Sequence, residues 1–218
     1  MIGFIPAAGT NARWGSGYKE LLPIGEGEWL LSNTIKTLQA IGCDKFFIGT
    51  STEKISSHLN FLKQTGQDHN VCFTIGGRTM WETIYRFLPV AYERVVMIMP
   101  DTIVEFHNWV PGTADFELGL FETKTPERFS VYQNECLIKK PVSFPKGIYR
   151  AWGAVSWSPQ VSRDWMLKYH LRHSEERDEY NEAFMHAMKH YKTNFFDIQF
   201  YRDFADWKDY YSFIKGDI

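Results

Sequence analysis

The stretch IGFIPAAGTNARWGSGYKELLP, residues 2–23, decides how the rest of the chain is interpreted. Its first residues are apolar, which is typical of a buried strand, and small residues follow where such a strand would end in a turn. In open α/β sheets, these turns offer backbone N–H groups to phosphates. Small side chains allow close backbone approach, and asparagine tolerates the left-handed conformation. The candidate nucleotide-binding residues are therefore Ala7, Ala8, Gly9, Thr10, Asn11 and Ala12.

Two cationic side chains in the same stretch could serve a triphosphate. Arg13 would act as a two-pronged hydrogen-bond donor and Lys19 as a mobile point charge. Both are candidate catalytic residues, because they could balance negative charge at the reacting phosphates. A tight turn with a solvated arginine and lysine would use the same residue types, so this stretch alone leaves both interpretations open.

The first half of the chain alternates between strand and helix patterns. Buried strands are predicted at residues 2–6, 45–50, 71–75 and 94–100, and amphipathic helices at 30–42 and 79–88. This alternation favours parallel strands joined by right-handed crossovers, with helices on both faces of the sheet.

The second half has a different pattern, which indicates an antiparallel extension. Strand-like segments occur at residues 116–121, 129–133, 135–140 and 149–157. Helical spacing returns at 159–170 and 181–191, and a final strand at 195–200 precedes a terminal helix. We predict an α/β protein with a mixed central sheet, and we take residues 1–218 as a single domain.

Composition restricts the classes of function. The chain has 44% hydrophobic and 23% charged residues, which is ordinary for a globular protein, and a formal net charge of −2 that does not favour nucleic acid as a partner. It has no apolar run of 18 residues and no secretion signal, so we expect a cytoplasmic protein without a membrane partner. The three cysteines lack CxxC spacing and are interpreted as reduced packing residues.

The first stretch resembles the signature of the sugar-1-phosphate nucleotidyltransferases, which is AGGxGTR followed, after a variable spacer, by PKxLLP. The matching residues are Ala8, Gly9, Arg13, Lys19, Leu21, Leu22 and Pro23. Asn11 and Ala12 replace the second glycine and the threonine of that signature, which removes one hydroxyl contact. The resemblance implies a three-layer α/β/α Rossmann-like nucleotidyltransferase fold.

Two aspartates are candidate Mg²⁺ ligands. Asp101 follows a predicted strand in MPDTIVE, where a carboxylate could hold Mg²⁺ or cap the next turn, and the resemblance implies the first role. The family pattern WxDIGTPEDY is similar to residues 201–213, which places Asp203 at the second metal carboxylate, with Ala205 and Asp206 in place of Gly and Thr. Asp197 is an alternative ligand that we expect to point out from a strand.

The resemblance also implies an acceptor site in the middle of the chain. PERFSVY (126–132) is similar to PERYGVV, and IKKP (138–141) is similar to EEKP, whose lysine meets the sugar phosphate. A polar turn and a solvated charge pair are the other interpretations of these two segments. The implied substrate-binding residues are Lys140, Lys139, Ser130, Tyr149 and Gly153. Ser130 replaces a glycine and Lys139 a glutamate, and a cation cannot accept bonds from sugar hydroxyls.

A further glycine-rich turn is a candidate for contacts with the base. Gly76, Gly77 and Thr79 follow the third predicted strand, where the family contacts the nucleotide base, although a tight strand-to-helix turn would look the same. Histidine pairs at 170 and 173 and at 186 and 190 have helical spacing but no obvious third metal ligand.

The activity implied by the resemblance is Mg²⁺-dependent transfer of a nucleotide from a nucleoside triphosphate to a sugar 1-phosphate or similar phosphomonoester, with release of pyrophosphate. Two alternatives stay open. One is a cytidylyltransferase for a non-hexose phosphate or phosphonate, and the other is a catalytically silent nucleotide- or sugar-binding module. Oligomerisation also stays open.

Overall fold

Strand β1 (Ile2–Pro6) lies near the middle of a ten-stranded sheet in the computed structural model, which describes residues 1–9, 18–141, 145–169 and 179–216. All five residues of β1 are buried, as expected for a strand covered on both faces. It pairs in parallel with β4 (Lys45–Thr50) and β6 (Val95–Ile98), and β4 pairs in parallel with β5 (Val71–Ile75). The predicted parallel half is confirmed.

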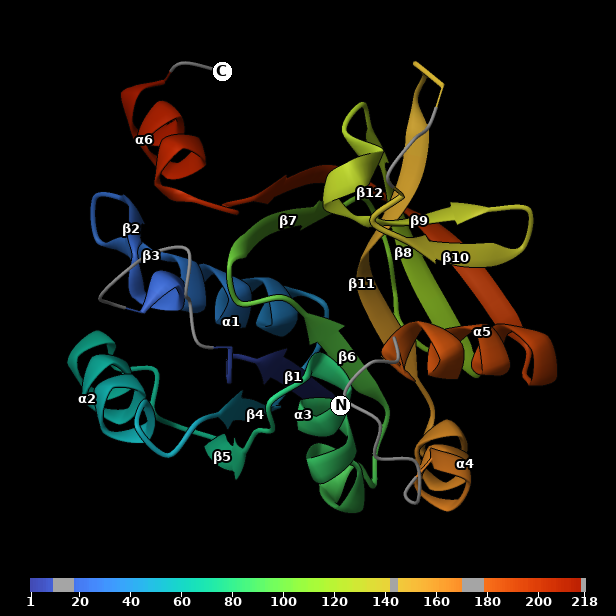
Figure 1. Ribbon diagram of the computed structural model, residues 1–218. Coiled ribbons are helices and arrows are strands. Elements are labelled where there is room, and N and C mark those ends of the chain that lie inside the picture. The colour runs from blue at the N-terminus through green and yellow to red at the C-terminus, as the bar shows by residue number, and fades with distance from the viewer. Residues whose placement is uncertain (10–17, 142–144, 170–178, 217–218) are drawn as a thin grey trace.

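The sheet becomes mixed beyond β6. Strand β11 (Tyr149–Trp157) is antiparallel to β6 and to β8 (Phe116–Thr123), whereas β12 (Thr193–Asp203) is parallel to β8. Strand β7 (Thr102–Phe106) closes this side by pairing antiparallel to β12. The hairpin of β9 (Ser130–Gln133) and β10 (Cys136–Lys139) branches from β11, and together with β8 and β11 it forms the predicted antiparallel extension (Figure 1).

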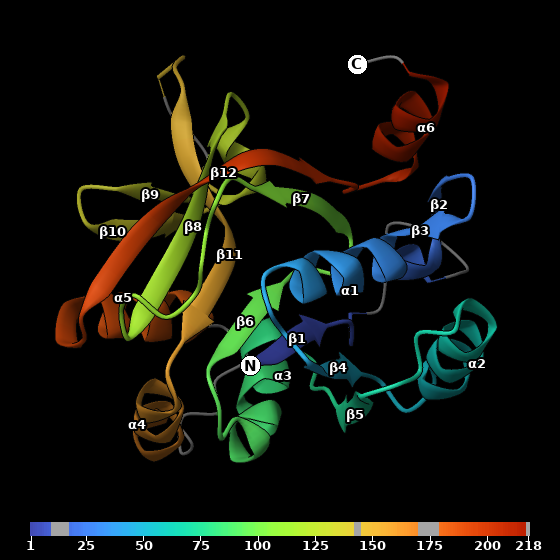
Figure 2. The same cartoon turned by 180° about the vertical axis from the view of Figure 1, so that it is seen from behind.

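Helices cover both faces of the sheet. Neighbouring residues on β1, and likewise on β6, pack into different hydrophobic cores. Phe4 and Met97 enter a core with α3 (Met80–Phe87), α4 (Pro159–Tyr169) and α5 (Glu179–His190). Ile5 and Ile98 enter the opposite core with α1 (Leu30–Ala40) and α2 (Ile55–Thr65). Because side chains alternate across a strand, two separate cores require two layers of helices. Figures 1 and 2 show α1 and α3 on opposite sides of β1, which gives the expected three layers.

A small substructure lies beside the carboxyl end of β1. It consists of the hairpin of β2 (Pro23–Gly25) and β3 (Glu28–Trp29) and the helix α6 (Trp207–Lys215), and the hydroxyl of Tyr210 donates to the carbonyl of Pro23 at 2.6 Å. Short 3₁₀ helices occur at Lys19–Leu21, Leu88–Val90 and Pro126–Arg128. Figure 1 shows α6 next to β2, far from α5.

Some elements differ from the sequence predictions. Helix α2, strand β7 and the β2–β3 hairpin were not predicted from the sequence, and β12 is longer at both ends than the predicted strand at 195–200. Cys43 is buried as expected, but Cys72 and Cys136 are exposed, so the packing interpretation is wrong for these two. Among the described residues, no helix has both the length and the apolar character needed to cross a membrane.

Candidate active site

The turn after β1 forms one wall of a cavity of about 150 Å³, which we call the loop cavity. Its lining comes from three strand ends and the 3₁₀ helix, namely residues 6–9, 20, 77–80, 83 and 99–101. The predicted nucleotide residues Ala7, Ala8, Gly9, Gly77 and Thr79 therefore share one cavity with Asp101. Thr10, Asn11, Ala12 and Arg13 lie outside the described residues, so their predicted roles stay predictions.

Lys19 contacts Asp101, which lies between β6 and β7 and lines the loop cavity. Its Nζ donates to Oδ2 of Asp101 at 2.5 Å, and the lysine side chain is only 10% exposed. The 3₁₀ helix Lys19–Leu21 sets this direction, because it sends Lys19 and its neighbour Glu20 into the protein together. The structure thus brings together one predicted catalytic cation and one predicted metal carboxylate.

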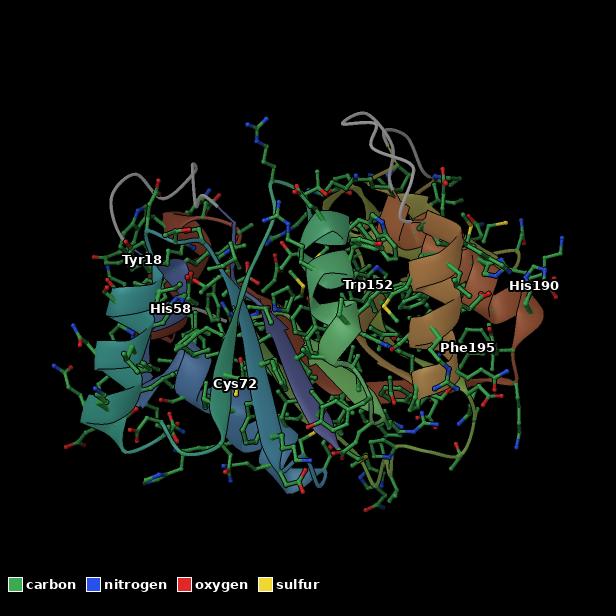
Figure 3. All side chains as sticks on the ribbon, turned by 90° about the horizontal axis from the view of Figure 1, so that it is seen from below. Tyr18, His58, Cys72, Trp152, His190 and Phe195 are labelled. Carbon is green, nitrogen blue, oxygen red and sulfur yellow. The ribbon has the colours of Figure 1, made fainter. Side chains whose placement is uncertain are left out.

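A buried charge network, formed by Glu20, Lys54, His58 and Thr50, contacts the turn after β1 at Ala7. Nζ of Lys54 donates to the carbonyl of Ala7 at 3.1 Å and to Oε1 of Glu20 at 2.9 Å. Nε2 of His58 contacts the same Oε1 at 2.9 Å, and its Nδ1 contacts the Thr50 hydroxyl at 2.9 Å. Figure 3 shows His58 on α2 close to Tyr18. The network links α2, β4 and the end of β1.

The charge on Glu20 is stabilised by this network. Burial would raise the pKa of the Glu20 carboxyl, but the contact with His58 and the charge and hydrogen bond of Lys54 lower it to about 2. Glu20 is therefore ionised at neutral pH, and Lys54 is held between its carboxylate and the Ala7 carbonyl.

The glycine turn before α3 is tied to the helix it precedes. The hydroxyl of Thr79 caps α3 by accepting from the Glu82 N–H at 3.0 Å, and Glu82 accepts from the Arg78 N–H at 2.7 Å. A Cβ on Gly76 would lie 2.3 Å from the Ala8 Cβ, so glycine permits close contact with the nucleotide loop.

The N–H groups of both glycines in this turn already have acceptors. Gly76 donates to the Thr50 carbonyl at 2.8 Å, and Gly77 donates to the Thr83 hydroxyl at 3.1 Å. That the turn contacts a nucleotide base stays a prediction, and groups other than these two N–H groups would have to make the contact.

The pairing of β7 with β12 brings the two candidate metal carboxylates to one place. Asp101 immediately precedes β7 and Asp203 ends β12, with Thr102 opposite Asp203 in the ladder. The N–H of Phe204 donates to the Asp101 carbonyl at 3.2 Å. Burial raises the pKa of Asp203, the nearby Asp101 carboxylate adds to this, and Arg128 and Lys19 oppose it. The strand register and the Phe204 hydrogen bond therefore place Asp101 and Asp203 next to each other across the β7–β12 pair.

The guanidinium of Arg128 forms an ion pair with the Asp203 carboxylate. Its Nη2 donates to both oxygens of Asp203, at 3.0 and 2.9 Å, and to Oδ2 of Asp209 at 2.8 Å. Burial opposes the charge on Arg128, but the two carboxylates raise its pKa further above the ordinary value. Asp206 caps α6 by accepting from the N–H groups of Lys208 and Asp209, which holds Asp209 in the first turn of this helix.

A second cavity of about 500 Å³ opens beside Asp203, and we call it the aromatic cavity. It is lined by residues 121–125, 128–129, 148, 201–203 and 209. Tyr201 stacks on Phe121 with 3.8 Å between ring centroids, and Phe129 meets Phe121 edge-on at 5.0 Å. Burial and the carboxylates of Asp203 and Asp101 raise the pKa of Tyr201 well above its ordinary value, which keeps the phenol neutral.

The two candidate metal carboxylates line different cavities. Asp101 lines the loop cavity and Asp203 lines the aromatic cavity. Among solved proteins, a crystal structure from Bacillus anthracis named as a glucose-1-phosphate thymidylyltransferase, in complex with a sucrose, aligns with a TM-score of 0.79. The alignment covers 99% of this chain and 94% of that chain at 21% sequence identity. The fold is that of a nucleotidyltransferase.

Sequence comparisons add no family assignment to this fold. No family model matches the chain. No curated protein matches it either. The nucleotidyltransferase fold therefore rests on the arrangement of the chain in space, and the roles of individual residues rest on the geometry of the two cavities.

The predicted acceptor residues lie around β9, β10 and β11, outside the described lining of the two cavities. Ser130 is buried against α5, where its hydroxyl meets Asn181 and Tyr180. A Cβ on Gly153 would lie 2.6 Å from the Tyr201 ring, so close packing requires glycine there. Their roles as substrate-binding residues stay predictions.

The remaining three predicted acceptor residues lie toward the protein surface. Lys139 and Lys140 are exposed where β10 ends, and the Lys140 N–H donates to the Phe129 carbonyl at 2.8 Å. The hydroxyl of Tyr149 donates to the Pro145 carbonyl at 2.6 Å. Their substrate contacts also stay predictions.

Sequence reasoning did not assign roles to the residues nearest Asp203. Arg128 is part of the PERFSVY segment, and Asp209 lies in the segment that contains Asp203, so both were within quoted motifs. The alternative ligand Asp197 has an 87% exposed side chain and pairs with Arg150, as expected for a residue that points out from a strand.

The paired histidines of α5 lie apart from both cavities. His186 contacts Asp164 at 2.9 Å, and Nδ1 of His190 contacts the His186 carbonyl. Figure 3 shows His190 at the opposite edge of the molecule from Tyr18 and His58. Within the described ranges, no set of three or more His, Cys, Asp or Glu side chains is placed to hold a metal ion.

Proposed function

We propose that the protein is an enzyme that transfers a nucleotide from a nucleoside triphosphate to a sugar 1-phosphate or a similar phosphomonoester, with release of pyrophosphate. The observation that carries this proposal is the carboxylate pair of Asp101 and Asp203 between two cavities of a nucleotidyltransferase fold. The triphosphate would occupy the loop cavity, and the phosphorylated acceptor would approach from the aromatic cavity. We take residues 1–218 as one catalytic unit.

The donor set of the carboxylate pair fits Mg²⁺. Magnesium is usually bound through one or two carboxylates, with substrate phosphates and water completing its coordination, so a third protein ligand is not needed. Asp101 and Asp203 would hold the ion. When bound, it would neutralise charge on the reacting phosphate groups.

The side chains around the carboxylates would position the reactants. Lys19, next to Asp101, would stabilise negative charge on the triphosphate side, and Arg13 would act with it. The Ala7 carbonyl is held by Lys54, so this part of the turn after β1 would be positioned before the triphosphate binds. No covalent intermediate with the protein is required, because the acceptor phosphate oxygen can attack the α-phosphorus directly.

The decisive experiment measures pyrophosphate release with each of the four nucleoside triphosphates against a panel of phosphomonoesters, with and without Mg²⁺. Glucose 1-phosphate and phosphocholine represent the hexose and non-hexose acceptors. Turnover with CTP and a non-hexose phosphate would favour the cytidylyltransferase alternative, and nucleotide binding without turnover would favour a silent binding module.

Variants then test the site itself. Asp101→Asn and Asp203→Asn should each lower kcat/KM by at least roughly a hundredfold, because each removes charge stabilisation at the reacting phosphates. Asp197→Asn is the matched control, because Asp197 lies on the same strand as Asp203 but is exposed and pairs with Arg150. Equal activity of all three variants would contradict the proposed site.

A further inference from the structure

Arg128 is bound to one of the two carboxylates that the proposed function assigns to the metal. Its guanidinium donates to both oxygens of Asp203, and the side chains of Arg128 and Asp203 are 32% and 22% exposed. A divalent cation that coordinates Asp203 would approach the same oxygens. Two cations bound to the same carboxylate repel each other, so the metal ion and the Arg128 guanidinium would compete for Asp203.

The surroundings of Arg128 offer it a second anionic partner. Asp209 accepts from Nη2 at 2.8 Å and from Nη1 at 3.4 Å, and the capped first turn of α6 holds it in place. Nε of Arg128 is buried and has no acceptor within the part of the chain that the structure describes. The guanidinium is therefore shared between two carboxylates and could release one while it keeps the other.

We propose that Arg128 is a positioning residue that serves as the counter-cation of Asp203 before metal binding and gives up this carboxylate to the divalent cation, while Asp209 retains the guanidinium. This inference rests on the proposed function, because it needs Asp203 to be a metal ligand. It assigns opposite effects to Arg128 and Asp209: the arginine weakens metal binding, and Asp209 strengthens it by holding the arginine back.

The test measures binding of Mn²⁺ to the full chain without substrates, by the electron paramagnetic resonance signal of the free ion. Mn²⁺ favours the same oxygen ligands as Mg²⁺. Arg128→Met should bind Mn²⁺ roughly two- to tenfold more tightly, in line with the loss of one partly exposed competing ion pair. Asp209→Asn should bind it more weakly by a similar factor, since Arg128 would then bind Asp203 alone.

Two further variants control for general charge and for folding. Lys208→Met removes a positive charge from an exposed position next to Asp209 and should leave Mn²⁺ affinity unchanged. Arg128→Lys keeps the positive charge but not the bidentate guanidinium, so its Mn²⁺ affinity should lie between those of the wild type and Arg128→Met. Circular dichroism and thermal unfolding establish that each variant is folded. A role confined to stability would lower the melting temperature without producing opposite shifts in Mn²⁺ affinity.

The outcomes separate this inference from the proposed function. Asp203→Asn should abolish or strongly weaken Mn²⁺ binding; if it binds the ion as the wild type does, the metal site and the inference both fail. If Asp203→Asn loses binding but Arg128→Met binds Mn²⁺ no more tightly than the wild type, only the inference is overturned. Unchanged or tighter binding by Asp209→Asn would also overturn it.

Discussion

Replacing Lys54 with methionine should destabilise the protein by about 3–5 kcal/mol, because the change keeps a long side chain but leaves the Glu20 carboxylate buried without its cation. The side chains of Lys54 and Glu20 are only 5% and 3% exposed, so water cannot screen the loss. The contacts of Glu20 with His58 and Lys54 together outweigh burial and lower its pKa from 4.5 to about 2, so the charge on Glu20 depends on both partners, and Lys54 accounts for only part of this shift.

Chemical denaturation at neutral pH measures this effect as the change in unfolding free energy. Lys36→Met is the matched control, because Lys36 also pairs with a glutamate, Glu28, but the two side chains are 53% and 49% exposed. That variant should cost less than about 1 kcal/mol. A double-mutant cycle with Glu20→Gln should show that the losses are not additive. If Lys54→Met costs no more than the control, or the cycle is additive, the buried network does not hold the nucleotide loop in the way described.

Three further predictions concern the same region and the sheet. Thr79→Ala removes the cap that accepts from the Glu82 N–H and should cost about 1 kcal/mol in thermal unfolding, whereas Thr79→Ser should cost little. Gly153→Ala places a methyl group 2.6 Å from the Tyr201 ring and should destabilise the protein by about 1–3 kcal/mol; an unchanged melting temperature would contradict this packing. Because the pKa of Glu20 is depressed, its contribution to stability is present above about pH 4.5 and is lost as the pH falls toward 2, so the stability difference between wild type and Glu20→Gln should shrink over that interval.

The central strands were predictable because local sequence and burial agree in them. β1, β4 and β6 are short apolar runs, and a strand covered on both faces needs apolar residues at successive positions. β7 was missed because its residues, TIVEF, give a short and mixed pattern, and its place in the sheet depends on pairing with β12. The extension of β12 to Asp203 has the same cause, since residues 201–203 lie opposite β7.

The candidate site was predictable only in part for a related reason. Asp101 and residues 7–9 could be placed from the ends of predicted strands, because the ends of parallel strands meet at one sheet edge. The contact of Arg128 with Asp203 joins residues 75 positions apart and depends on how β12 and α6 pack. The buried network of Glu20, Lys54, His58 and Thr50 was not predicted either. It depends on α2, which carries His58, and that helix was not predicted from the sequence.

The insertion of β12 between β8 and β7 has a consequence for a chain that is still being synthesised. Asp101 leaves the ribosome long before Asp203, since nearly half the sequence separates them. Until β12 has been made, β7 lacks its partner strand, and β8 and β7 each present an open edge that other chains could pair with. The nascent protein therefore lacks one of the two proposed metal carboxylates, and the edges of β8 and β7 that β12 will cover stay open to other chains until the strand carrying Asp203 enters the sheet.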